Sequence, residues 1–139
     1  MSELSISKRH APVSTSLIFA LACLVPATAF AADGAKEIAT AAKHAGMSSE
    51  AANLVGVRAH LHHTLNCLEG TSGADFDASA ANPCAGMGNG AIADTADAAV
   101  KKQLVDAAAT ARETLSIDDL SKAKAGAKKV ADALAGIGK

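Results

Sequence analysis

The sequence predicts an all-α protein, a four-helix up-and-down bundle built from two helical hairpins. Half of the 139 residues are hydrophobic but only 2% are aromatic, and alanine, the strongest helix former, dominates the chain. Apolar residues recur every three or four positions, as they do on one face of a helix. Residues 35–69 and 98–135 each have the pattern helix, tight turn, longer helix. Two hairpins that are apolar on one side bury those sides most simply against each other.

The first 31 residues have the features of a secretory signal peptide. Lys8 and Arg9 precede an apolar run, residues 17–25, that is too short to span a bilayer. Small residues then follow at "AFA", 29–31, so we expect cleavage between Ala31 and Ala32. This predicts a periplasmic or secreted protein whose mature part, residues 32–139, is one small domain without a membrane span.

The first predicted hairpin lies directly after this segment. Residues 35–45 predict a short helix that ends at Gly46, because glycine suits the left-handed position just past a helix terminus. Ser48 or Ser49 then caps a second helix, which runs to about Leu68 and stops at Gly70.

Residues 69–93 predict a long loop, because they consist largely of Gly, Asn, Asp, Ser and Pro. Loops of this length in compact domains are usually functional, tethered or disordered. Cys84 lies in this loop, and Cys67 is the other cysteine of the mature chain. Two cysteines in an exported chain most simply form one disulfide, which would tether the loop. The alternative is a pair of free thiolates that bind a metal.

The second hairpin is predicted from its caps and its apolar faces. Asp94 opens a third helix that continues to about Thr114, and Ser116 caps a fourth, with Asp119 as its capping-box partner. The inward positions of the third helix are Val100, Leu104, Ala108, Ala111 and Leu115. Those of the fourth helix are Leu120, Ala123, Ala127, Val130, Leu134 and Ile137.

The stretch "RAHLHHTLNC", residues 58–67, carries three histidines and a cysteine on the second predicted helix. If its leucines face the core, a helical projection places His60, His63 and Cys67 together on the opposite face. A histidine pair three residues apart can chelate one ion, and neutral imidazole suits copper, zinc or nickel. A thioether from Met87 in the loop would favour copper(I). His44 is either a cation near a helix C-terminus or a further ligand.

Two resemblances accompany these patterns. The stretch H-x-H-H-x-x-N-C-L-x-G at 60–70, with N-P-C at 82–84, resembles a group of small exported bacterial proteins over most of the mature chain. That resemblance implies an exported helical protein and brings no activity with it. "AAKHAG", 41–46, is similar to a repeat of small metal-binding four-helix proteins of Gram-negative bacteria. That family spreads histidines over all its helices, whereas none follows His63 here, which implies one metal site at most.

Two functions follow from the sequence. The first is an exported protein that binds a transition metal, copper or zinc, through His60 and His63, with Met87 or His44 assisting. The alternative is a non-catalytic module that contacts another protein of the cell envelope. We expect no enzyme, because no nucleophile, acid–base pair or cofactor motif is evident. Haem is disfavoured by the lack of CxxCH and of an aromatic-rich pocket. A net charge of −1 without basic clusters argues against nucleic acid.

Overall fold

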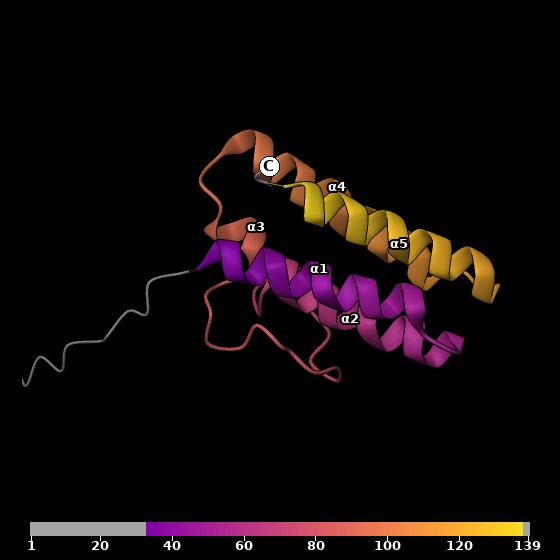
Figure 1. The fold of residues 1–139 in the computed structure, drawn as a ribbon. Helices are drawn as coiled ribbons and strands as arrows, with labels where there is room; N and C mark the ends of the chain where they lie inside the picture. Colours follow the sequence, from indigo (N-terminus) through magenta and orange to yellow (C-terminus); the bar gives the residue numbers. More distant parts are fainter. Residues whose placement is uncertain (1–32, 138–139) are drawn as a thin grey trace, which may run out of the picture.

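The computed structural model describes residues 33–137, and over this range the chain forms helices and no strand (Figure 1). The helices are α1 (Gly34–Glu50), α2 (Leu54–Glu69), α3 (Ala91–Asp94), α4 (Ala98–Leu115) and α5 (Leu120–Gly136). The all-α prediction is confirmed. None of these helices has the length and hydrophobicity that a membrane span requires. The predicted signal peptide and its cleavage site lie outside the described residues.

The four long helices pack as two antiparallel hairpins, α1–α2 and α4–α5 (Figure 1). Helix α1 packs against both α2 and α5, and α4 packs against α5 and α2. The long segment between α2 and α4 contains one feature that the sequence did not predict, the short helix α3.

The α1–α2 turn lies further along the chain than predicted. Helix α1 continues through Gly46 to Glu50, and Asn53 rather than a serine caps α2, accepting a hydrogen bond from Gly56 N. A glycine inside a helix costs roughly 0.5–1 kcal/mol relative to alanine, which buried packing of the flanking turns can offset. Ser48 is fully buried in that packing.

The predicted caps of the second hairpin were also wrong by a few residues. Asp94 ends α3 instead of opening the next helix, and Asp97 caps α4 through backbone amides of its first turn. Ser116 terminates α4, while Asp119 itself is the N-cap of α5 and accepts from Lys122 N. Each aspartate takes the cap because its carboxylate reaches an unpaired amide of the first turn.

The two hairpins bury equivalent positions, sixty-six residues apart. Ala41, Ala45 and Ser48 of α1 are buried, and so are their α4 counterparts, residues 107, 111 and 114. The α2 positions that share burial with their α5 counterparts are Val57, Leu61, Thr64 and Leu68, matched by Ala123, Ala127, Val130 and Leu134. Leu61 and Ala127 thus occupy equivalent buried positions, and so do Leu68 and Leu134.

The long loop is held against α2 by a sulfur contact and by an amide. The Sγ atoms of Cys67 and Cys84 lie 1.99 Å apart, within disulfide distance. Next to Cys67, the buried Asn66 accepts a hydrogen bond from Asp77 N at 2.8 Å. The Asn66 amide also donates to the carbonyl oxygens of Asp77, at 3.0 Å, and Ala81, at 3.2 Å. These contacts fix the long loop against α2.

Candidate metal centre

Three histidines from two helices converge on the seam between α1 and α2. His44 comes from α1, and His60 and His63 come from successive turns of α2. Each offers one ring nitrogen, and these atoms all lie within 4.8 Å of one another. The Nδ1 atoms of His44 and His60 are 3.4 Å apart. The ring centroids are separated by 5.1 Å for His44–His63, 5.5 Å for His60–His63 and 5.6 Å for His44–His60.

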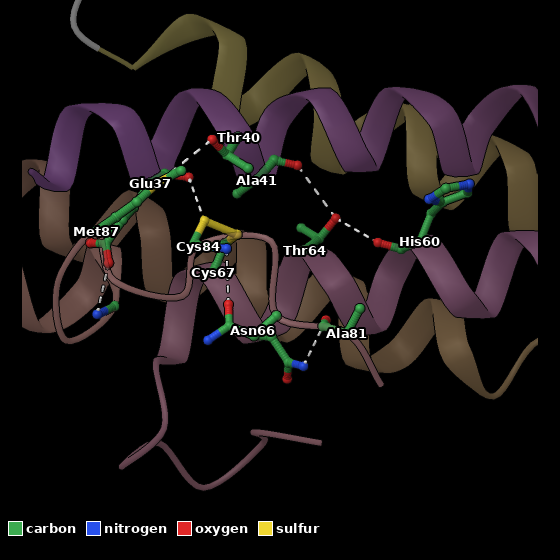
Figure 2. Close-up of a disulfide and its surroundings, with 12 residues drawn as sticks. Glu37, Thr40, Ala41, His60, Thr64, Asn66, Cys67, Ala81, Cys84 and Met87 are labelled. Carbon is green, nitrogen blue, oxygen red and sulfur yellow. Dashed lines mark hydrogen bonds between the residues drawn. A yellow bond between two sulfur atoms is a disulfide. The ribbon is translucent and has the colours of Figure 1, made fainter. Parts of the chain in front are cut away.

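Cross-helix hydrogen bonds on either side of the histidines fix how α1 and α2 meet. On one side, the buried Thr64 hydroxyl lies 3.3 Å from Ala41 O of α1 and donates to His60 O at 2.9 Å (Figure 2). On the other side, the buried Ser48 hydroxyl donates to Val57 O of α2 at 2.8 Å. The histidines therefore project from helices whose register is set before any ligand binds, as a preorganised site requires.

The predicted orientation of the second helix was wrong in one respect. The projection placed His60, His63 and Cys67 on the face opposite the core, but Cys67 is fully buried and both histidines are half-buried. The cause is that α2 packs against three other long helices, not one. The leucines of α2 enter the common core, while His60 and His63 face α1. Alanines 41 and 45 on α1, both fully buried, allow the close approach.

The electrostatic environment favours neutral imidazoles. Burial lowers the pKa of His44, and the nearby His63 and His60 rings lower it further. Burial likewise lowers the pKa of His63, with His60 and His62 adding to the effect. His63 Nδ1 is buried without a hydrogen-bond partner in the described part of the chain. An unpaired buried nitrogen is costly, and binding a cation would remove that cost.

The spacing of the nitrogens is close to what a tetrahedral ion needs. Imidazole nitrogens bind zinc at about 2.0–2.1 Å, so two ligands of a tetrahedral ion lie about 3.3–3.4 Å apart. The His44–His60 separation of 3.4 Å already matches this value. Side-chain rotation that closes the remaining separations would complete a three-histidine site, leaving one coordination position for water or another donor.

The structure brings together three of the four predicted ligands. Met87 lies apart from them: its sulfur is 4.0 Å from Thr40 Oγ1, and its carbonyl oxygen accepts from Asp33 N. Figure 2 shows Met87 and His60 on opposite sides of the Cys67–Cys84 pair. His44 was only an optional ligand in the prediction. Its signal was present in the sequence, since it lies three residues after Ala41 and four before Ser48 on one helical face.

The fourth histidine of residues 33–137, His62, belongs to a different environment. Its Nδ1 lies 3.1 Å from Asp77 Oδ2 of the long loop, an ion pair when the ring is protonated, although the contact lacks hydrogen-bond geometry. His62 is therefore a matched control for the three clustered histidines, because it shares their helix and chemistry but not their partners.

Packing of the fold does not by itself call for histidines at these positions. Sixty-six residues further along the chain, the equivalents of His44, His60 and His63 are Thr110, Gly126 and Lys129. The positions that flank the histidines are buried in both hairpins, so α4 and α5 pack together without imidazoles.

Two surface grooves lie elsewhere. One of about 560 Å³ runs between α4 and α5, and one of about 470 Å³ is bordered by α1, α3, α4 and α5. No histidine lines either groove. A metal ion needs converging donor atoms rather than a large cavity, so the histidine cluster is the stronger candidate site.

A buried carboxylate lies at the far end of α1. Glu37 is 1% exposed, and its Oε1 accepts a hydrogen bond from Gly90 N at 3.1 Å. Burial raises the pKa of Glu37; the hydrogen bond from Gly90 opposes this, and the neighbouring Asp94 carboxylate reinforces it. Asp94 in turn accepts from Asn89 N at 2.6 Å. The glycine-rich segment 86–90 thus supplies amides to the protein's own carboxylates.

No protein family, curated protein or solved structure is significantly similar to this chain. The two resemblances noted in the sequence therefore stay predictions.

Proposed function

We propose that this is an exported four-helix-bundle protein, closed by a Cys67–Cys84 disulfide, that binds one transition-metal ion through His44, His60 and His63. The observation that carries the proposal is the convergence of three imidazoles from two helices, with one nitrogen pair already 3.4 Å apart. The lowered pKa values of His44 and His63 support it, because only neutral imidazole binds a metal.

Copper is the metal we propose first, and zinc second. An all-imidazole set suits both, and among divalent first-row ions copper(II) binds nitrogen sites most tightly. A hard ion such as calcium or magnesium is disfavoured, since it prefers oxygen ligands. The three histidines hold the ion: they position three donors and leave one coordination position open.

Native mass spectrometry of the exported protein, purified without chelator or affinity tag, tests the proposal. The apo mass reports the cleavage site and the loss of two hydrogens expected for a disulfide. Titration with copper(II) or zinc(II) should add one ion per chain. The triple variant His44→Ala, His60→Ala, His63→Ala should lose that ion, whereas His62→Ala should keep it.

The proposal fails if the triple variant and the wild type take up metal equally. A protein that takes up no metal at all would instead support the alternative, an interaction module of the cell envelope. In that case the histidine row is a surface, and crosslinking in the envelope becomes the next experiment.

A further inference from the structure

The three histidines leave one coordination position, and the next turn of α1 carries a methionine. On α1, the residues one turn after His44 are Met47 and Ser48. Ser48 is fully buried and committed to Val57 O. Residues three apart on a helix are neighbours, with Cβ atoms about 5–6 Å apart, so Met47 is adjacent to His44 on the outer side of the seam.

The Met47 side chain is partly open to solvent and is not part of the hydrophobic core. Its exposed fraction is 39%, and it is one of three large hydrophobic side chains of residues 33–137 that are exposed, with Val55 and Val105. A methionine has three rotatable bonds, so an unpacked one can turn toward a bound ion at small cost.

The chemistry of the added donor differs from that of the histidines. A thioether is a soft ligand that selects copper(I), whereas zinc(II) is held well by imidazole alone. We propose that Met47 is the fourth ligand of the His44–His60–His63 site and that it gives this site its preference for copper(I) over zinc(II). Met47 thereby takes the part that the sequence suggested for Met87. This inference rests on the proposed metal site and adds its selectivity.

The chain offers a matched pair of variants for the test. Met47→Leu and Met87→Leu each replace a thioether by an apolar side chain of similar size. Copper(I) affinity is measured anaerobically by competition with the chelator bathocuproine disulfonate, with ascorbate as reductant and a thiol assay to verify that the disulfide persists. Zinc(II) affinity is measured in parallel with a chromophoric zinc chelator, and circular dichroism verifies that each variant is folded.

Met47→Leu should weaken copper(I) binding by at least about tenfold and leave zinc(II) binding within about twofold of wild type. Met87→Leu should change neither. X-ray absorption at the copper edge should detect one sulfur neighbour in the wild type and in Met87→Leu, and none in Met47→Leu.

Equal copper(I) affinity in Met47→Leu and wild type would overturn the inference, as would a sulfur signal that follows Met87. Both results are separate from failure of the proposed function, which is decided by zinc(II) binding to the histidine variants. If zinc binding depends on the histidines but copper(I) binding ignores Met47, the metal site stands and the thioether ligand is wrong.

Discussion

Metal binding by this site should stabilise the folded protein, because the ligands come from α1 and α2 and the unfolded chain does not hold them together. A ligand present at about one hundred times its dissociation constant stabilises the native state by about 2.7 kcal/mol. For a domain of this size, each kcal/mol raises the melting temperature by about 4–8 °C. Saturating zinc(II) should therefore raise the melting temperature by about 10–20 °C.

His44→Ala is the most informative variant, since it removes the one imidazole that α1 supplies. Outer-shell partners of a metal are already worth about 10- to 100-fold in affinity, so loss of a direct ligand should cost about 100-fold or more. At the same zinc concentration the stabilisation then falls to about 0.4 kcal/mol, a shift of about 2–3 °C.

The assay is thermal unfolding followed by circular dichroism, with and without zinc(II), and with a chelator added to reverse the effect. His62→Ala is the control and should respond to zinc like the wild type, because His62 faces Asp77 and not the cluster. An equally large zinc shift in His44→Ala and wild type would refute the reasoning. It would mean that His60 and His63 bind the ion within α2 alone and that the seam plays no part.

Three further predictions concern the rest of the fold. Replacing Cys67 and Cys84 together by alanine should lower the free energy of unfolding, measured in urea, by about 3 kcal/mol. This is the contribution expected from closing a loop of sequence separation 17 in the unfolded chain. A loss below about 1 kcal/mol would show that the loop needs no crosslink. Because the pKa of Glu37 is raised from 4.5, its contribution to stability is complete below about pH 4.5 and is lost as pH rises through the raised pKa. Glu37→Gln should therefore flatten the fall in the free energy of unfolding between about pH 4 and 8. An unchanged pH dependence in the variant would assign that fall to another group. Gly126→Ala should lower the free energy of unfolding by about 1–3 kcal/mol, since the new Cβ would lie 2.5 Å from a threonine hydroxyl of α4. In Gly46→Ala the new Cβ meets nothing within 4 Å, so this variant should stabilise α1 by roughly 0.5–1 kcal/mol. Equal changes in melting temperature would contradict the close α4–α5 packing.

The helices could be predicted from the sequence, but their ends could not. Periodicity identified the buried Leu104 and Val130 correctly, because side chains on one helical face repeat whatever the neighbours are. Glycine at position 46 predicted a stop, yet α1 continues four residues beyond it. Local propensity favours an end there by only a fraction of the energy that tertiary packing supplies, and packing cannot be read from one segment.

The site was predicted in part for a related reason. His60 and His63 followed from spacing within one helix, but the inclusion of His44 depends on how α1 is rotated against α2. A projection with one buried stripe assumes one neighbour, whereas a bundle helix has several, and so Cys67 was assigned to the wrong face. The position of Met87 depends on the course of a long loop, which composition does not determine.

The repeated hairpin gives the strongest reason to regard the histidines as ligands. The buried positions around the site recur in both hairpins, and the second hairpin has Thr110, Gly126 and the exposed Lys129 in place of the histidines. Histidine is thus unnecessary for packing, and burial lowers the pKa values of His44 and His63 and so favours the neutral imidazole that a metal binds. Lys129 would repel a cation at the equivalent place in the second hairpin. The site should therefore bind a single ion per chain, held where the two halves of the repeat differ.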